Sequence, residues 1–393
     1  MSWAACTIVS KNYLAYARAV AQSYRRQHPG GRFFVLLVDR CDGYFDPGSE
    51  PFELVAVEDL TLPAAERMCF QYTVLELNTA VKPYFLAHLL DKYGIGKLIY
   101  LDPDILVTGD LGAVGRLLDE YSIVLTPHLT VPIEDEAKPT ELDVLRAGAY
   151  NLGFLAVAAT STTHRFLVWW QRRLMRGGRM DPDLGMHVDQ RWIDLVPGMF
   201  EGVCVLRDEG YNVAYWNLHS RVVTMGADGQ VRVNGRRCYF FHFSGIDPED
   251  LEPVSRHQTR FRLAELGEGT RRLFAEYGEL VVANGYRETR RWPYAFGTFS
   301  NGIQITDLAR RLYWELGEEA WRFGNPFQAE GSDSFFGWLR RREAELPLTV
   351  RLYMHVVAPW EPRLIPVLRK VLGQETWLGG KLRRLRRRLR AVA

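Results

Sequence analysis

The amino-acid sequence predicts an α/β fold, and three observations support that prediction. Short unbroken apolar runs, typical of strands buried on both faces, alternate with stretches of helical period over residues 3–110. One of these runs, 98–101, ends abruptly in Asp102 and Asp104, as expected where a buried strand reaches the edge of an open sheet. The 393 residues, of which 47% are hydrophobic, are enough for one large domain with a buried core and a smaller appended region.

The first part of the chain contains the clearest alternation. We expect strands at residues 3–9, 33–38, 52–57 and 98–101, and helices at 14–26, 64–77 and 82–92. A helix that follows the first strand directly presents its free N–H groups to an anionic group at the sheet edge. The order of elements therefore predicts a nucleotide-binding α/β half that ends near residue 110.

Asp102 and Asp104 flank a proline that fixes its own φ and disfavours helix at the residue before it. Both carboxylates can then turn to one side, and two hard oxygen ligands suit Mg²⁺ or Mn²⁺ shared with substrate phosphates. A simple acidic turn is an alternative, and so is a phosphatase whose first Asp is the nucleophile. The phosphatase is the weaker option, because Ile105 follows the second acid and the sequence has no adjacent Asp pair.

Residues 111–202 continue the pattern. The sequence predicts helices at 111–118 and 162–175, strands at 122–125 and 151–157, and a polar loop at 131–146 able to fold over a ligand. Gly153 permits close backbone approach to a ligand and Asn151 can donate to a sugar hydroxyl, with a strand-start turn as an equal alternative. A further helix is expected from Gly185, with Asp189 and Gln190 early in it, where an acid often only compensates the helix dipole.

Two more positions have both a functional and a structural interpretation. Four short strands are expected within residues 203–243, and the last ends in His242, Phe243, Ser244 and Gly245. A histidine there can supply a neutral imidazole to a metal while the next N–H groups meet phosphate, or it can be a capped turn histidine. Lys82 opens a helix beside a proline, where it can meet phosphate or be an exposed surface lysine.

These motifs, in this order and spacing, resemble the retaining glycosyltransferases of the bacterial lipopolysaccharide galactosyltransferase and glycogenin type, over roughly residues 3–247. The resemblance implies a GT-A fold, a Rossmann-like nucleotide-binding mixed sheet, and beyond it the sequence predicts a C-terminal helical region. It implies that Asp102, Asp104 and His242 hold Mn²⁺ or Mg²⁺, and that Asp189 and Gln190 are catalytic groups beside the sugar C1. The donor-binding residues that it implies are Val9, Ser10, Asn12, Tyr13, Lys82, Asp102, Asn151, Gly153, Ser244 and Gly245.

The sequence departs from that family in two places. Ser10 and Lys11 stand where these enzymes often have an acid, so UDP-sugar is favoured less than the resemblance alone suggests, and the expected donor is a nucleoside-diphosphate sugar. After Gly245 the family usually continues with Lys-Pro-Trp, whereas this chain continues with Ile246 and Asp247. Arg256 or His257 could supply the missing phosphate-binding cation.

The chain is expected to have three regions: a catalytic domain at 1–253, an accessory helical region at 254–376 and a basic tail at 377–393. Helices are predicted at 260–274, 306–316 and 335–346. The aromatic segment 292–302 is expected to be an acceptor platform or an interdomain packing surface. The sequence does not decide whether the accessory region binds the acceptor or mediates self-association into a homo-oligomer.

Charge and cysteine usage suggest where the protein works. Removing the seven basic residues of 381–390 from the net charge of +2 leaves −5, and the tail has helical leucine spacing, which favours an anionic membrane surface as partner. A solvated tail and nucleic acid are the alternatives, and we expect no nucleic acid because the rest of the chain lacks a basic stripe. Five scattered cysteines, no visible signal peptide and no apolar run near membrane-span length predict a cytoplasmic protein, peripheral at the inner face of the membrane.

The function expected from the sequence is transfer of a sugar from a nucleoside-diphosphate donor to a glycan or lipid-linked acceptor, with retention, in bacterial envelope polysaccharide or glycolipid synthesis. A nucleotide-sugar hydrolase that uses the same donor site is the first alternative. The second is an inactive regulator that binds the donor. The Asp-x-Asp and His242 count against the regulator, because loss of activity would relax the metal site first.

Overall fold

A computed structural model describes residues 3–345 of the chain, and its two compact units are described separately. The first unit extends to residue 297 and contains every predicted site residue, and the second begins at residue 298. The predicted boundary after residue 253 falls inside the first unit. The basic tail, 377–393, and residues 346–376 lie outside the described residues.

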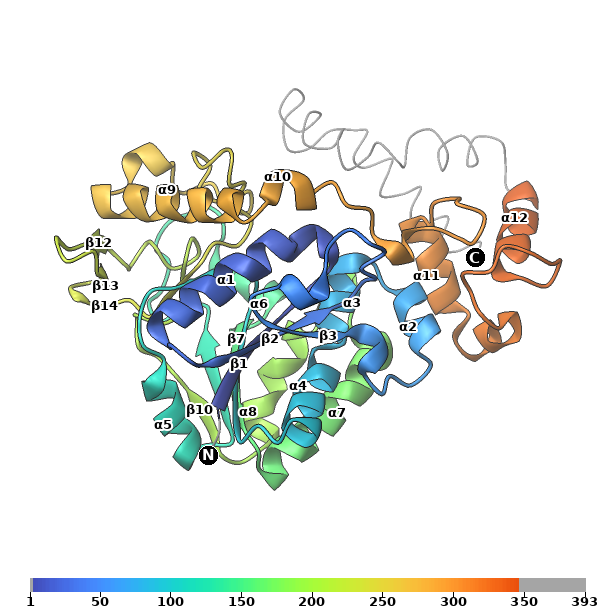
Figure 1. Cartoon of the computed structure of the whole chain (residues 1–393), viewed down its shortest axis with the longest axis horizontal. Helices are drawn as coiled ribbons and strands as arrows, with labels where there is room; N and C mark the ends of the chain where they lie inside the picture. Colours follow the sequence, from blue (N-terminus) through green and yellow to red (C-terminus); the bar gives the residue numbers. More distant parts are fainter. Residues whose placement is uncertain (1–2, 346–393) are drawn as a thin grey trace. The chain divides into compact units, whose positions relative to one another are not determined.

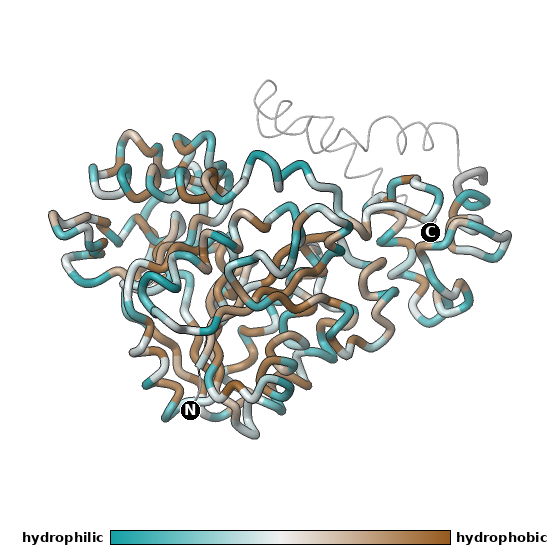
Figure 2. The backbone as a smooth tube through the Cα atoms, viewed as in Figure 1, coloured by the Kyte–Doolittle hydropathy of each residue, from teal (hydrophilic) through white to brown (hydrophobic). Residues whose placement is uncertain are grey.

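The first unit is organised around a seven-stranded mixed sheet with the order β10-β6-β7-β4-β1-β2-β3 (Figure 1). β7 is antiparallel to β4 and β6, whereas the other neighbours are parallel. The strands are β1 (Trp3–Val9), β2 (Arg32–Leu37), β3 (Glu53–Ala56), β4 (Lys97–Leu101), β6 (Ile123–Pro127), β7 (Tyr150–Ala158) and β10 (Val203–Val205). Strands β1, β2, β4 and β7 are buried almost throughout, so their continuous apolar runs require cover on both faces. Figure 2 shows the hydrophobic residues concentrated along these strands. The predicted α/β class with a mixed sheet is confirmed.

Helices cover both faces of this sheet. α1 (Leu14–Gln27) and α5 (Gly112–Glu120) share one core with the strands, which includes Val20, Tyr24 and Val114. The opposite face is covered by α3 (Val74–Ala80), α4 (Lys82–Lys92) and α7 (Ser161–Gly177), of which α4 and α7 pack on each other. Alternate residues of a strand point to opposite faces, so the buried strands contribute apolar side chains to the cores on both faces of the sheet.

A second, three-stranded sheet completes the site. Its order is β11 (Val213–Ala214), β15 (Phe240–His242) and β5 (Ile105–Val107), with β15 antiparallel to β5. It shares a core with the outer flank of α1 and with α9 (Glu268–Ala283), where Phe243 stacks on Tyr277 at 3.8 Å between ring centroids. The remaining elements of the unit are α2 (Ala65–Gln71), α6 (Glu141–Ala147), β8 (Met180–Asp181), β9 (Met186–His187), α8 (Val196–Met199), β12 (Val223–Met225), β13 (Val231–Val233), β14 (Arg236–Arg237) and α10 (Tyr286–Thr289).

Two predicted helices begin or break elsewhere than expected. The single helix at 64–77 is wrong: α2 and α3 are separate, because Thr73 and Glu76 cap the start of α3 reciprocally through side chain and backbone. The helix predicted at 260–274 begins later, as α9. Before it, the Arg260 guanidinium is held by the Asp135 carboxylate and the Pro139 carbonyl, and a short 3₁₀ helix follows at Leu263–Glu265.

Two segments near the site also differ from the prediction. The helix expected from Gly185 is wrong, since residues 180–187 form the β8–β9 hairpin and a 3₁₀ helix follows at Gln190–Leu195. The polar loop at 131–146 is a loop only in its first part, because α6 begins at Glu141. Thr140 caps that helix, and its hydroxyl accepts from the Asp143 N–H.

The second unit is helical in the residues described, as predicted. It contains α11 (Asp307–Glu315), a 3₁₀ helix at Gly317–Phe323 and α12 (Phe335–Glu345). Phe335 is fully buried and packs edge-on against Tyr313 and Phe323. Within residues 3–345, no helix combines the length and the apolar character that crossing a bilayer requires.

Candidate active site

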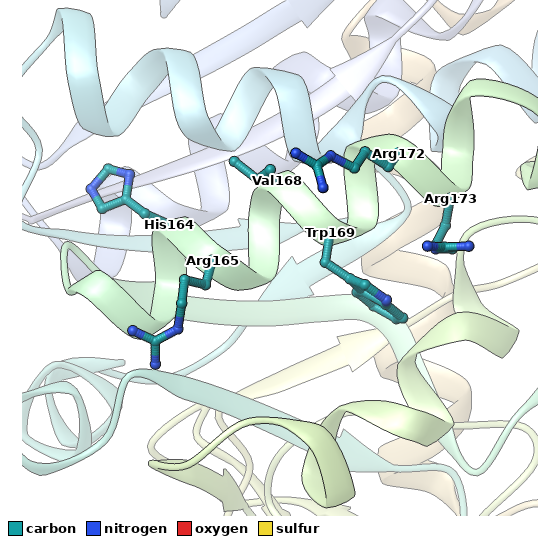
Figure 3. A pocket seen from close by; sticks show the side chains of 6 residues that line it. All are labelled: His164, Arg165, Val168, Trp169, Arg172 and Arg173. Atoms are coloured by element: carbon teal, nitrogen blue, oxygen red, sulfur yellow. The ribbon is translucent and has the colours of Figure 1, made fainter.

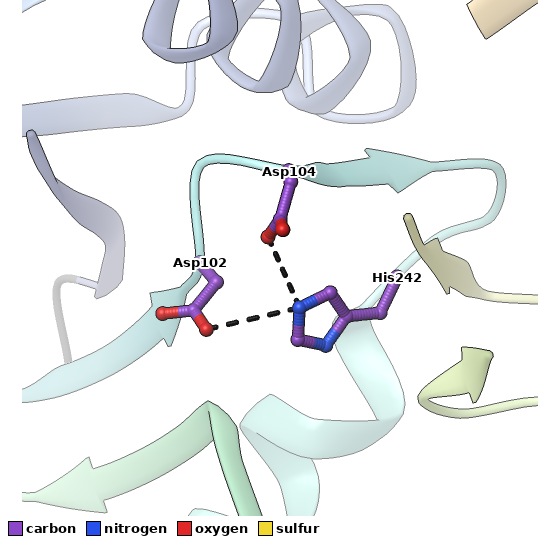
Figure 4. Close-up of side chains that lie close together, drawn as sticks. All are labelled: Asp102, Asp104 and His242. Carbon is purple, nitrogen blue, oxygen red and sulfur yellow. Dashed lines mark ion pairs between the residues drawn. The ribbon is translucent and has the colours of Figure 1, made fainter. Parts of the chain in front are cut away.

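Asp102, Asp104 and His242 converge at the carboxyl end of β4 (Figure 4). His242 Nε2 lies 3.0 Å from Asp104 Oδ1 and 3.7 Å from Asp102 Oδ2, and one ligand atom from each residue lies within 4.8 Å of the others. The histidine is buried, whereas 31% of the Asp102 side chain and 21% of the Asp104 side chain are exposed. The cluster is therefore open on its carboxylate side.

Backbone hydrogen bonds fix these three side chains. The turn after β4 is held on one side by the Asp102 N–H, which donates to the Gly153 carbonyl of β7 at 2.7 Å. On the other side the Phe243 N–H donates to the Asp104 carbonyl at 2.8 Å, and His242 lies opposite Ile105 in the β5–β15 pairing. Two strand pairings, with β7 and with β15, thus set the geometry of the cluster.

The close approach predicted at Gly153 is made to the His242 ring. A Cβ atom at position 153 would stand 2.3 Å from His242 Cε1 and 2.7 Å from His242 Nδ1. Because real Cβ contacts of that length do not occur, any other residue at this position would displace the imidazole.

Asn212 orients His242, and the motifs in the sequence gave no indication of this role. Its Nδ2 donates to Asn151 Oδ1 at 3.0 Å and to Thr126 Oγ1 at 2.8 Å, which leaves its Oδ1 as the acceptor 3.3 Å from His242 Nδ1. Nδ1 of His242 then carries a proton, and Nε2 faces the two carboxylates. The only sequence signal was an asparagine in a polar-aromatic segment, and Asn212 indeed has a left-handed φ of 53°.

This arrangement fits a divalent cation. The carboxylates of Asp102 and Asp104 repel each other, and a positive charge beside His242 Nε2, either a protonated imidazole or a bound cation, offsets that repulsion. Two oxygens and one neutral imidazole are suitable ligands for Mn²⁺, and the hydrogen bond from Nδ1 to Asn212 is the outer-shell contact that metal-binding histidines usually make. Burial lowers the pKa of His242, but Asp104 and Asp102 outweigh that effect and raise it overall, so the pocket favours positive charge at this point.

Lys82 is buried and paired, so the exposed-lysine interpretation is wrong. Its ammonium lies 2.8 Å from Asp189 Oδ2, donates to the Leu152 carbonyl at 3.0 Å, and sits 4.2 Å from the centre of the Tyr100 ring. Tyr100 in turn donates to Asp102 Oδ1 at 2.6 Å. Burial raises the pKa of Asp189 even though Lys82 opposes the shift. Tyr100 connects this ion pair to Asp102 of the carboxylate cluster.

The predicted catalytic residues Asp189 and Gln190 are both buried. Gln190 Oε1 accepts from the Leu152 N–H at 2.9 Å, and its Nε2 donates to the Ala147 carbonyl at 2.9 Å. Val188, directly before the pair, is a β-branched residue with a left-handed φ of 43°. Such backbone strain is concentrated at functional sites in proteins, which supports a role for this segment.

The predicted donor residues after β1 lie beside a buried ion pair. Ser10 Oγ donates to Asn12 Oδ1 at 2.8 Å, Val9 is buried, and Tyr13 remains 40% exposed while stacking on Tyr16. Lys11 is fully buried, and its ammonium contacts Asp39 Oδ1 and Asp42 Oδ2, each at 3.2 Å. The lysine that departs from the family pattern is therefore engaged with β2 and its loop.

Ser244 and Gly245 form a tight turn against residues 255–257. Ser255 Oγ donates to the Ser244 carbonyl at 2.7 Å, the Arg256 N–H donates to the Gly245 carbonyl at 3.1 Å, and a Cβ at Gly245 would meet His257 Cδ2 at 2.4 Å. Burial and the Asp104 charge raise the pKa of Tyr13 while the Arg256 charge opposes that shift. Val254, at the start of this segment, also has a left-handed φ, 60°.

The chain is similar in sequence to two uncharacterized proteins and similar in fold to solved structures of glycosyltransferases. No established family profile matches the chain. Two uncharacterized proteins of Bacillus subtilis (strain 168) are similar: YfnF is 24% identical over 266 residues, covering 66% of this chain and 87% of YfnF, and YfnD is 25% identical over 246 residues, covering 61% and 76%.

Several solved structures similar to this chain are glycosyltransferases. Galactosyltransferase LgtC, in complex with donor and acceptor sugar analogs, is 16% identical with a TM-score of 0.42, covering 71% of this chain and 95% of LgtC. Glycosyltransferase GlyE of Streptococcus pneumoniae TIGR4 is 12% identical with a TM-score of 0.42, covering 76% of this chain and 67% of GlyE. Because these TM-scores are below 0.5, the functional proposal depends on the site itself.

Proposed function

We propose that the protein is a metal-dependent glycosyltransferase that moves a sugar from a nucleoside-diphosphate donor to a glycan or lipid-linked acceptor. The observation that carries the proposal is the convergence of Asp102, Asp104 and His242 at the carboxyl end of the central strand. Open α/β sheets bind ligands at that edge, and this ligand set suits Mn²⁺ or Mg²⁺ shared with a diphosphate.

The surrounding residues suit the chemistry of such a transfer. Breaking the bond between sugar C1 and the diphosphate oxygen leaves negative charge on the diphosphate, and a bound divalent cation neutralises that charge when present. Asp189 and Gln190 are the groups that the family resemblance places beside the sugar C1, and Lys82 holds Asp189 in place through their 2.8 Å contact. We propose retention at C1 and a role in bacterial envelope polysaccharide or glycolipid synthesis by family resemblance.

Arg256 is proposed as the phosphate-binding cation that replaces the missing lysine after Gly245. Its side chain is exposed and Nε donates to His257 Nε2 at 3.2 Å, so the guanidinium lies beside the turn that closes over the cluster. The Arg256→Ala variant should bind nucleoside diphosphate at least about tenfold more weakly, since charge-assisted hydrogen bonds to phosphate are strong. Unchanged affinity in a titration calorimeter would contradict this assignment.

A thermal-shift screen tests the proposed function. Nucleoside diphosphates and their sugars are added with and without Mn²⁺ to the wild type and to Asp104→Ala, because a ligand that binds only the folded state raises the melting temperature. We expect a shift that requires both the metal and Asp104, and the responding nucleotide identifies the donor. No shift with any nucleotide would overturn the proposal.

A nucleotide-sugar hydrolase with water as acceptor is the second candidate. It is favoured by the open carboxylate side of the cluster, where 31% of the Asp102 side chain is exposed. Product analysis with and without glycan or lipid-linked acceptors separates the two: free sugar formed at the same rate in all mixtures indicates hydrolysis. Donor binding without any turnover would indicate the regulator.

A further inference from the structure

We propose that the outer face of α7 is a docking surface for an anionic lipid membrane. This α7 face consists of His164, Arg165, Val168, Trp169, Arg172 and Arg173, which line a shallow hollow on the surface of the first unit (Figure 3). In the sequence these residues are adjacent pairs spaced four apart, so they repeat along one side of the helix. The proposal concerns a different part of the chain from the basic tail and is independent of the proposed function.

The two sides of α7 have opposite character. The inner side is buried against the sheet layer through Thr163, Phe166, Leu167, Trp170 and Leu174. The outer side exposes its arginines, and Figure 3 shows Arg165, Arg172 and Arg173 extending away from the helix. The inner side supplies the buried packing of the helix, whereas Arg173 lies 6.0 Å from the centre of the Trp192 ring.

The charge on this helix is unbalanced. Ser161–Gly177 contains four arginines and no acid, in a chain whose net charge without the basic residues of 381–390 is −5. Some exposed arginines of the first unit have carboxylate partners, such as Arg272 with Glu276 and Arg287 with Glu249. Among the residues that the structure describes, no ion pair involves Arg165, Arg172 or Arg173. This leaves them free to meet anionic phosphates.

Exposed apolar side chains accompany these charges, and they favour lipid over a soluble polyanion. Val168 is 45% exposed and Met175 is 39% exposed on α7 itself. Trp169 lies 5.7 Å from Phe200 between ring centroids, which joins the helix to a neighbouring segment where Leu195 and Met199 are each 51% exposed. Binding to an anionic membrane surface depends on buried apolar area together with attraction to the lipid phosphates, and this face offers both.

The test uses the full-length protein and vesicles of phosphatidylcholine with and without phosphatidylglycerol. The variant Arg165→Gln/Arg172→Gln/Arg173→Gln is compared with Arg25→Gln/Arg26→Gln/Arg116→Gln, which removes the same charge from exposed positions on α1 and α5. Both sets are made in a background where the seven basic residues of 381–390 are glutamine, so that the tail does not mask the effect.

We expect the α7 triple variant to partition onto phosphatidylglycerol vesicles on the order of a hundredfold more weakly, and the control triple to differ from its parent by less than about threefold. Val168→Ser should weaken partitioning a few-fold without a charge change, unlike Leu142→Ser on α6, which is similarly exposed. Equal partitioning of the two triple variants would overturn the proposal. Salt-sensitive binding to heparin without binding to vesicles would also overturn it, in favour of a soluble polyanion.

Discussion

The imidazole of His242 lies directly against the Cα of Gly153, on a strand 89 positions earlier in the sequence. No side chain fits between them, because a Cβ at position 153 would be 2.3 Å from His242 Cε1. The absence of a side chain at residue 153 is therefore required for His242 to lie next to Asp102 and Asp104.

Gly153→Ala should weaken Mn²⁺ binding by at least about tenfold, because the methyl group pushes the His242 ring away from Asp102 and Asp104. Isothermal titration of Mn²⁺ measures the change. Gly115→Ala is the matched control, since a Cβ there meets nothing within 4 Å. It should leave Mn²⁺ affinity unchanged and stabilise α5 by about 0.5–1 kcal/mol. Equal Mn²⁺ affinities for the two variants would show that the ring position does not matter.

Two substitutions of Asn212 should distinguish the effect of its acceptor oxygen on Mn²⁺ binding from the effect of its donor N–H groups. Asn212→Gly accommodates the left-handed φ but removes the acceptor at His242 Nδ1, so Mn²⁺ affinity should fall about 10- to 100-fold. Asn212→Asp keeps an acceptor oxygen and should retain Mn²⁺ binding while losing the hydrogen bonds donated to Asn151 and Thr126. Electron paramagnetic resonance of free Mn²⁺ gives both affinities. A loss of the same size in the two variants would contradict the orienting role.

The buried Lys82–Asp189 pair should show strong thermodynamic coupling. Lys82→Met or Asp189→Asn alone leaves a buried group without its partner and should lower the free energy of unfolding by about 3–5 kcal/mol. The double variant should cost less than the sum of the two. Urea unfolding of the four proteins measures the cycle. Glu276→Gln, which breaks the exposed Arg272–Glu276 pair, should cost less than about 1 kcal/mol, and a comparable cost at both pairs would contradict the prediction.

Stability should fall in acid partly because of His128. Burial lowers its pKa from 6.5 to about 3, and the Asn151 amide donates to its Nε2, which requires the neutral ring. Below pH 6.5 the unfolded chain binds a proton that the folded chain does not, so stability decreases as the pH falls from 6.5 towards 3, by up to about 1.4 kcal/mol per pH unit.

His128→Gln removes this titration and keeps a side-chain acceptor for the Asn151 amide. Urea unfolding at several pH values should give a shallower pH dependence for the variant than for the wild type. Since every other titrating group is common to both proteins, parallel curves would mean that His128 is not the cause.

Local sequence rules predicted the regular part of the fold well. The run at 98–101 forms β4 because burial on both faces needs a continuous apolar strand, and the two acids that follow it indicate the site by their position alone. The prediction failed where side-chain contacts override propensity: Thr73 caps a new helix inside one expected helix, and another begins only at Glu268, after Arg260 bonds to Asp135 and Pro139. Neither contact can be read from periodicity.

The sequence predicted the three residues of the proposed metal site, but it did not predict the residues that hold them in place. His242 and the two acids share chemistry that a motif can reveal, whereas Asn212 matters only because its backbone turns left-handed beside the histidine. Lys82 was expected either at phosphate or in solvent, and its buried partner Asp189 lies 107 positions later. Long-range pairing of this kind is decided by tertiary packing, which single-residue patterns do not contain.

The pairing of β15 with β5 also determines when the site can form during synthesis. All seven strands of the main sheet lie before residue 206, so a growing chain can complete that sheet while β15 and its histidine are still unmade. Until residues 240–242 leave the ribosome, Asp102 and Asp104 have no imidazole opposite them. A growing chain can therefore complete its main sheet before the three residues of the proposed metal site come together.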